Sequence, residues 1–229
     1  MQASVVYWLS ANYRASGAAV AMDESPADVM RKAMNKLVKR WKRRFDDMAQ
    51  KLADRFAKDA MKNADASLAT AFKDAGFTVE FKMTSQMNNA LQATIAENVG
   101  LIRSIPEKYF TEVEGLVMRS VARGRDLSYL TDELEKRYGI TRRRAALIAR
   151  DQNNKATSVM QAARQQSLGI TQGVWRHSHA GKEPRPSHVK ADGKVFELSK
   201  GMYLDGKWVM PGEEINCRCT WSPVIPGLS

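Results

Sequence analysis

Apolar residues recur at alternating spacings of three and four positions over residues 26–169, and this pattern predicts long amphipathic helices. The first helix is expected to start at residues 23–26, where a capping residue precedes Pro26, a residue suited to the first helical position. Its spacing is close to a heptad repeat, which predicts packing against a second long helix. The apolar face comprises Met30, Met34, Leu37, Trp41, Phe45, Met48, Leu52 and Phe56.

Glycine and proline divide the rest of this region into shorter predicted helices. Pro106 is expected to close one helix and to open the next. Residues 77–82 alternate apolar and polar positions, as in a short strand or an extended turn. Ser128 and Thr141 are candidate N-caps for two later helices. The other predicted breaks are Gly76, Gly124, Gly139 and the C-cap candidate Gly169.

After Gly169 the pattern changes to short β-prone runs separated by turn dipeptides. Residues 202–204 and 207–209 are expected to form a hairpin around Asp205-Gly206. Strands are expected at residues 174–177 and 217–221. The other turn and loop signals are Asp192-Gly193, Pro211-Gly212, Pro184 and Pro186.

These patterns predict an α+β protein, with a mainly helical body of long amphipathic helices followed by a small β-rich C-terminal module. The predicted divisions are a loosely ordered N-terminal arm over residues 1–25, a helical body over 26–169 and the β-rich module over 170–229.

Positive charge is concentrated on the first long helix. The chain has 36 Lys and Arg against 25 Asp and Glu, and residues 31–62 alone hold 12 Lys or Arg against 4 Asp, a net of +8. Such a helix can contact DNA phosphates, dock on an acidic protein surface, or be a solvated face, and the first two are preferred. Trp41 and Phe45 continue the apolar register, which favours a core role for them. The densest basic cluster is Lys39, Arg40, Lys42, Arg43 and Arg44.

No segment reaches the roughly 20 apolar residues that span a bilayer, and no basic region precedes the apolar start of the chain. We therefore expect no membrane association. Cys217 and Cys219 are separated by one residue, and a disulfide across so short a loop would be strained. A reducing cytoplasm is the expected site of synthesis.

Histidines and cysteines of the C-terminal module are candidate metal ligands. Residues two apart on a strand face the same side, so Cys217 and Cys219 can present both sulfurs to one point, and His177 and His179 both rings. The expected set for a structural zinc ion is His188, Cys217 and Cys219, with His177 or His179 as the fourth ligand. This spacing matches no standard zinc finger, which favours buried cysteines and hydrogen-bonded turn histidines without a metal.

Arg185 and Arg218 are expected to have structural roles in the same module. A guanidinium group can bridge loop carbonyls or pair with an acidic residue, and so hold turns together. Asp192 and Asp205 are the candidate partners.

The order of residues in this module resembles the Mu F-like phage head-morphogenesis family. The resemblance covers roughly residues 90–225 and includes residues 147–152 just upstream of the module. The residues that carry it are Trp175 on a strand, Arg185 three positions before His188, Asp192-Gly193 before Phe196, Pro211-Gly212, and Cys217-Arg218-Cys219.

The resemblance implies a minor structural protein of a tailed-phage head, associated with the portal during capsid assembly. It also implies a place in the virion near the portal vertex, after synthesis in the host cytoplasm. The major capsid protein, a scaffolding protein and packaged double-stranded DNA are further expected partners. Some family members are implicated in DNA packaging or ejection, and no enzymatic activity is expected.

Two other function classes remain as alternatives. One is a metal-dependent hydrolase or nuclease, built on His177, His179, His188, Asp192 and Asp205. The sequence has no paired-carboxylate motif, no Gly-rich phosphate loop and no nucleophile elbow, and the adjacent Glu213-Glu214 does not fit an ADP-ribosyltransferase. The other is a DNA-binding protein that uses the basic helix, but no compact helix-turn-helix is visible.

Overall fold

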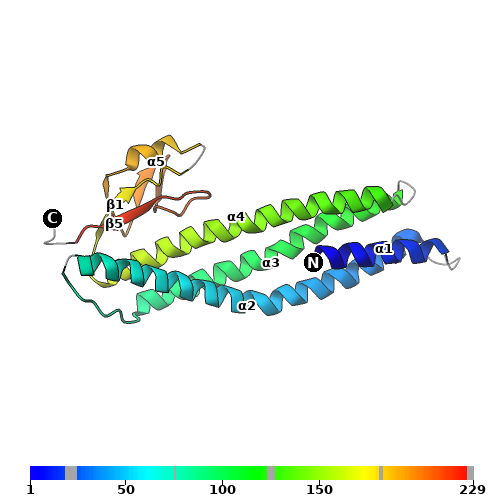
Figure 1. Ribbon diagram of the computed structural model, residues 1–229, viewed down its shortest axis with the longest axis horizontal. Coiled ribbons are helices and arrows are strands. Elements are labelled where there is room, and N and C mark those ends of the chain that lie inside the picture. The colour runs from blue at the N-terminus through cyan, green and yellow to red at the C-terminus, as the bar shows by residue number, and fades with distance from the viewer. Residues whose placement is uncertain (19–24, 75, 123–126, 181–182, 226–229) are drawn as a thin grey trace. The chain divides into compact units, whose positions relative to one another are not determined.

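The computed structural model describes residues 1–18, 25–74, 76–122, 127–180 and 183–225 (Figure 1). Long helices are followed by a small antiparallel β module, so the predicted α+β class is confirmed. The helices are α1 (Gln2–Ala18), α2 (Pro26–Asp74), α3 (Ser85–Ala122), α4 (Leu127–Ser167) and α5 (Pro186–Ala191). The strands are β1 (Gln172–Arg176), β2 (Val195–Glu197), β3 (Met202–Leu204), β4 (Lys207–Val209) and β5 (Thr220–Pro223).

The chain forms two compact units. Unit 1 comprises Met1–Lys51 and Val99–Ala146, and unit 2 comprises Leu52–Asn98 and Leu147–Ser229. The same three helices, α2, α3 and α4, therefore contribute to both units. The boundary predicted after residue 169 lies inside unit 2. None of the described helices is long and apolar enough to cross a bilayer.

Unit 1 is built around α1 and the first part of α2. The arm expected to be loosely ordered over residues 1–25 is helical over Gln2–Ala18, because Val5 and Leu9 bury one face of α1 in the core. At the start of α2, the Ser25 hydroxyl accepts a hydrogen bond from the backbone N–H of Asp28 (3.2 Å), as a capping residue does. Residues 19–24, including part of the predicted helix start, and the predicted break at Gly124 lie outside the described residues.

The core of unit 1 consists of large apolar side chains from its four helical segments, with Trp41 packed against them as predicted. Its buried members are Val5, Leu9, Met30, Met34, Leu37, Tyr109, Phe110, Val113, Leu116, Val117, Leu130 and Leu134.

The apolar face predicted along α2 is wrong at Met48 and Leu52, which are exposed. The predicted positions drift by about 80° between Met30 and Phe56 around a helix with 3.6 residues per turn. Alanine residues take most of the buried positions in the later part of α2, and the sequence signal of alanine is weak. These buried residues are Ala49, Ala53, Ala57, Ala60, Ala64 and Leu68.

Two predicted helix breaks are also wrong, because α3 runs through Pro106 and α4 runs through Gly139. A proline inside a helix costs about 3 kcal/mol and a glycine about 1 kcal/mol. Tyr109 and Phe110, which follow Pro106, are buried in the core of unit 1, so burial offsets the local cost. Residues 77–84 contain no strand and form an extended connection between α2 and α3.

The β module of unit 2 contains an antiparallel sheet in the order β2-β1-β5 and a separate β3–β4 hairpin. The hairpin predicted around Asp205-Gly206 is confirmed, and both residues have positive φ (49° and 83°), as a tight hairpin turn requires. Trp175 of β1 lies opposite Trp221 of β5, and both are buried in the module core.

Two details of the module differ from the prediction. Residues 217–219 precede the closing strand β5 and are not part of it. The predicted loop around Pro184 and Pro186 contains the short helix α5, with Pro186 at its first position. As Figure 1 shows, α5 follows β1 in the chain and belongs to the β module.

Candidate functional site

A buried cluster joins α5 to the segment before β5. His188 lies on α5, and Cys217 and Cys219 lie just upstream of β5. His188 Nδ1 is 3.5 Å from Cys217 Sγ and 3.7 Å from Cys219 Sγ. The three potential ligand atoms all lie within 4.8 Å of one another. The structure thus brings three of the five predicted metal ligands to one point.

The other nitrogen of His188 faces Glu214. His188 Nε2 is 2.9 Å from Glu214 Oε2, and Lys207 Nζ is 2.5 Å from Glu214 Oε1. The hydrogen bond from Lys207 lowers the pKa of Glu214 against the opposing effect of burial, and Arg185 adds to the lowering. An ionised carboxylate only accepts hydrogen bonds, so Nε2 is the nitrogen that donates to Glu214, and Nδ1 is the nitrogen that faces the sulfurs.

The two thiols influence each other. A hydrogen bond from the Cys219 thiol lowers the pKa of Cys217, and the backbone N–H groups of Cys219 and Gly212 add to this effect against burial. The same thiol–thiol hydrogen bond, together with burial, raises the pKa of Cys219. Cys217 is therefore the thiol that gives up its proton more readily.

The cysteines meet for a different reason from the one the sequence suggested. Strand alternation does not apply, because neither cysteine lies on β5. The chain turns at Gly212 (φ 84°) and Asn216 (φ 61°). Asn154 of α4 donates a hydrogen bond to the carbonyl of Cys217 (2.8 Å), and the backbone N–H of Gly212 approaches Cys217 Sγ (3.4 Å). Loop geometry and α4 together position the sulfurs.

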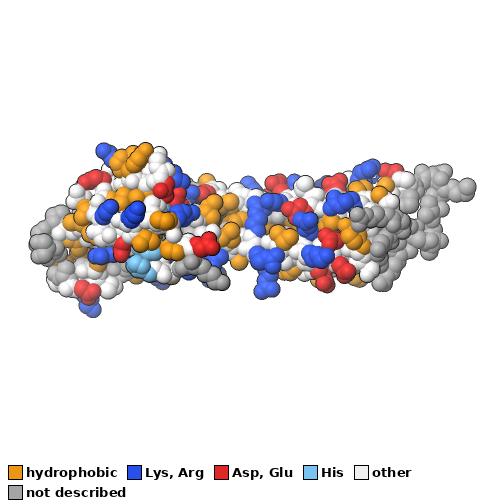
Figure 2. All heavy atoms as spheres, turned by 90° about the horizontal axis from the view of Figure 1, so that it is seen from above, with side chains coloured by type: hydrophobic (Ala, Val, Ile, Leu, Met, Phe, Trp, Pro, Cys, Tyr) orange, Lys and Arg blue, Asp and Glu red, His pale blue; other side chains and the backbone are white. Residues whose placement is uncertain are grey.

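His177 and His179 lie after β1 and outside the Cys-His cluster. Asp192 accepts a hydrogen bond from the backbone N–H of His177 (2.9 Å), and Asp192 Oδ2 lies 3.4 Å from His179 Nε2. The backbone hydrogen bond from His177 lowers the pKa of Asp192. In Figure 2, pale blue histidine atoms reach the molecular surface. These two histidines serve the turn at Asp192, and the expectation that one of them completes the metal set is not supported by their position.

Arg185 and Arg218 bridge loop carbonyls, as expected, but not through the predicted acidic partners. Arg185 donates a hydrogen bond to the carbonyl of Ile215 (2.9 Å), and Arg218 donates one to the carbonyl of Ala180 (3.1 Å). Asp205 instead accepts a hydrogen bond from the Ser187 hydroxyl (2.6 Å).

A polar pocket of about 250 Å³ borders the Cys-His cluster. The five residues of the hydrolase alternative do not converge on it. Among the described residues, the only group of potential metal ligands that meets is His188 with Cys217 and Cys219. The pocket is lined by His177, Ser178, Ala180, Glu183, Pro184, Arg185, His188, Asn216, Cys217, Arg218 and Cys219.

All five residues of the predicted basic cluster on α2 are exposed in unit 1. Lys42 pairs with Glu107 of α3 (3.1 Å), and the Arg44 guanidinium lies 5.0 Å from the centre of the Trp41 ring. A shallow pocket of about 420 Å³ on this surface is lined by Lys36, Lys39, Arg40, Arg43 and Arg44. On the face seen in Figure 2, Lys and Arg side chains also gather in groups between hydrophobic patches.

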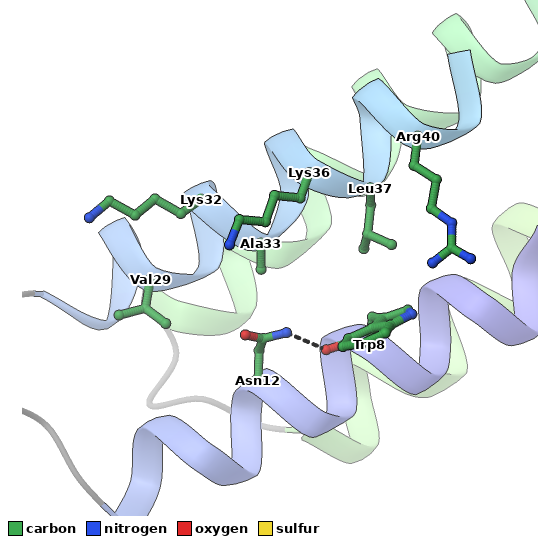
Figure 3. A pocket seen from close by; sticks show the side chains of 8 residues that line it. All are labelled: Trp8, Asn12, Val29, Lys32, Ala33, Lys36, Leu37 and Arg40. Carbon is green, nitrogen blue, oxygen red and sulfur yellow. Dashed lines mark hydrogen bonds between the residues drawn. The ribbon is translucent and has the colours of Figure 1, made fainter. Parts of the chain in front are cut away.

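Next to this basic pocket, α1 and α2 form a groove of about 440 Å³, which we call the α1–α2 groove (Figure 3). Its apolar walls come from both helices, and the charged side chains of Lys32, Lys36 and Arg40 lie along the α2 side. The sequence did not predict this groove, because residues 1–25 were expected to be loosely ordered. The groove is lined by Trp8, Asn12, Val29, Lys32, Ala33, Lys36, Leu37 and Arg40.

Comparisons with known proteins agree with the sequence resemblance. The family model described as Phage Mu protein F like protein matches residues 111–222, which confirms the resemblance to this family over that part of the chain. A Haemophilus influenzae (strain ATCC 51907 / DSM 11121 / KW20 / Rd) protein described as an uncharacterized protein is 28% identical over 201 residues, which cover 85% of this chain and 43% of that protein. The chain thus spans less than half of that relative. No solved structure matches the chain.

Proposed function

We propose, from the Mu F-like character of residues 111–222, that this protein is a minor structural protein of a tailed-phage head that acts in head morphogenesis. The family match is the observation that carries the proposal. The proposed role is assembly and not catalysis. Its proposed location is the phage head near the portal vertex, and its proposed main partner is the portal protein.

The α1–α2 groove is the proposed docking surface. Trp8 and Val29 offer apolar contact area, while Lys36 and Arg40 lie beside them. A groove with apolar walls and a cationic edge complements an amphipathic segment that carries acidic residues beside apolar anchors. We therefore propose that an acidic, apolar-anchored segment of the portal protein binds here.

Co-purification with the portal protein of the same phage tests this proposal. The double variant Lys36→Glu with Arg40→Glu is expected to weaken portal binding by about tenfold or more, since both repulsion and lost attraction act in a desolvated groove. The matched control is Lys62→Glu, an exposed charge reversal on the same helix outside the groove. Binding by a capsid or scaffolding protein, with no binding to the portal, would contradict the choice of partner.

A second candidate role is contact with packaged double-stranded DNA, during packaging or ejection. It is favoured by the pocket whose lining consists of Lys36, Lys39, Arg40, Arg43 and Arg44. Binding through phosphates weakens steeply as salt concentration rises. Duplex binding in a salt titration is expected to show that slope, and the slope should decrease in Arg43→Ala. An absence of duplex binding at low salt rules out this role.

A further inference from the structure

We propose that His188, Cys217 and Cys219 bind one zinc ion through Nδ1 and the two sulfurs. This site lies in the β module of unit 2 and does not depend on how the protein contacts a portal or DNA.

Donor spacing is the first support. Zinc bound tetrahedrally at about 2.3 Å from sulfur and about 2.0–2.1 Å from nitrogen separates neighbouring donor atoms by about 3.5–3.8 Å. His188 Nδ1 lies 3.5 Å from Cys217 Sγ and 3.7 Å from Cys219 Sγ. The nitrogen is therefore already spaced from both sulfurs as a tetrahedral zinc site needs, and the two sulfurs lie within 4.8 Å of each other.

The environment of His188 is the second support. Nε2 lies 2.9 Å from Glu214 Oε2, which is the carboxylate–histidine arrangement that fixes a ligating imidazole. The ring also packs edge-on against Trp175, with ring centres 5.3 Å apart. The imidazole is held on both sides, with Nδ1 directed at the sulfurs.

The arrangement of the donors also suits a metal ion chemically. Two sulfurs lie at nearly equal distances from Nδ1. A zinc ion uses all three donors at once. It replaces the two thiol protons, which pass to solvent, and the resulting assembly of one Zn²⁺ and two thiolates is neutral, as a buried site requires.

The site also lies where a cross-link is useful. It joins α5 to the segment before β5, and Asn154 ties that segment to α4. A β module this small gains stability from a bound metal. The three donors border the pocket of about 250 Å³, so a solvent molecule can complete the coordination.

Metal analysis of the purified full chain tests the proposal. One zinc per chain is expected after dialysis. Cys217→Ser and Cys219→Ser are each expected to lose it, while the matched control His179→Ala, an exposed histidine outside the cluster, keeps it. Substoichiometric zinc in the wild type, or zinc lost equally in the control, would overturn the proposal.

Two measurements keep the test valid if the cysteine variants do not fold. Cobalt-substituted wild-type protein is expected to show thiolate-to-cobalt charge-transfer bands and the intense visible bands of a tetrahedral site. Glu214→Gln is expected to bind zinc about 10–100-fold more weakly, since it alters the partner of a ligand without removing a ligand. A cobalt spectrum without thiolate bands would contradict the assignment.

Discussion

Unit 1 and unit 2 are built from parts of the same three helices but are stabilised in different ways. Unit 1 packs large apolar side chains together and places its charges on the surface. Of the seven buried polar or charged residues in the described chain, six lie in unit 2 and only Ser120 lies in unit 1. Nonpolar packing tolerates change at the surface, whereas a buried polar network requires each partner in place. Unit 1 is therefore suited to a docking surface and unit 2 to a fixed site.

The Arg164 network is the clearest example in unit 2. The side chain of Arg164 is 4% exposed, and its guanidinium donates to both carboxylate oxygens of Asp65 (2.6 and 2.9 Å) and to the carbonyl of Lys82 (2.6 Å). Arg164→Ala leaves these acceptors without their donor and is expected to destabilise unit 2 by about 3–4 kcal/mol, measured by urea unfolding.

The matched control for Arg164→Ala is Lys58→Ala, which removes an exposed pair with Asp54 (2.8 Å) in the same unit. Surface pairs of this kind contribute about 0–1 kcal/mol. Equal losses in the two variants would show that unit 2 does not depend on its buried network.

Backbone geometry gives a second test in the β module. Gly201 has φ 83°, and a Cβ there would lie 2.4 Å from the carbonyl oxygen of Val209. Gly201→Ala is expected to destabilise the module by about 2–3 kcal/mol, through left-handed strain and the clash. Gly206 has the same φ of 83° and no neighbour within 4 Å, so Gly206→Ala should cost about 1–2 kcal/mol. Because both glycines have the same φ, the difference in thermal stability between the two variants measures the cost of the clash alone.

In unit 1, removal of a buried polar group should increase stability, whereas the substitutions in unit 2 decrease it. The hydroxyl of Tyr109 is buried and has no hydrogen-bond partner among the described residues. Tyr109→Phe is expected to stabilise unit 1 by about 1 kcal/mol, because the folded protein no longer buries an unpaired hydroxyl. Chemical denaturation measures the change in the free energy of unfolding. A clear loss of stability would show that the Tyr109 hydroxyl stabilises this core, contrary to the prediction.

The same residue predicts an alkaline pH dependence. Burial, and secondarily Tyr138, raises the pKa of Tyr109 from 10.0 to about 12. The neutral phenol is thus favoured in the folded state, and its contribution is present in full below pH 10. As pH rises from about 10 to about 12, the unfolded chain ionises first and stability falls. Tyr109→Phe should reduce this slope in unfolding free energy measured against pH.

Local signals were predicted well from the sequence. The turn at Asp205-Gly206 requires positive φ, which those residue types adopt, so the hairpin was predicted with both of its arms. Continuity through Pro106 and Gly139 was not predicted, because burial of distant side chains decides it. Helix α1 was missed because its apolar residues keep to one face less clearly than those of the other long helices, and because the segment is rich in Ala, Ser and Gly.

In the candidate site too, residue types were predicted from the sequence, whereas contacts between residues far apart in the chain were not. His188, Cys217 and Cys219 were predicted as members of one set from their residue types and from an expected strand at residues 217–221. The role of Glu214 was not predicted, since its contact with His188 joins residues 26 positions apart. Positive φ at Gly212 and Asn216 shapes the loop that places the sulfurs, whereas the sequence pattern predicted that both cysteines lie on the closing strand.

Photo-crosslinking to the portal protein tests most directly whether unit 1 carries the docking surface. A photoreactive phenylalanine derivative replaces Trp8 in the α1–α2 groove in one protein and Trp208 of β4 in another, and the two tryptophans are 44% and 58% exposed. If the α1–α2 groove binds the portal protein, a strong portal crosslink is expected from position 8 and little or none from position 208. A portal crosslink from position 208 alone would contradict it.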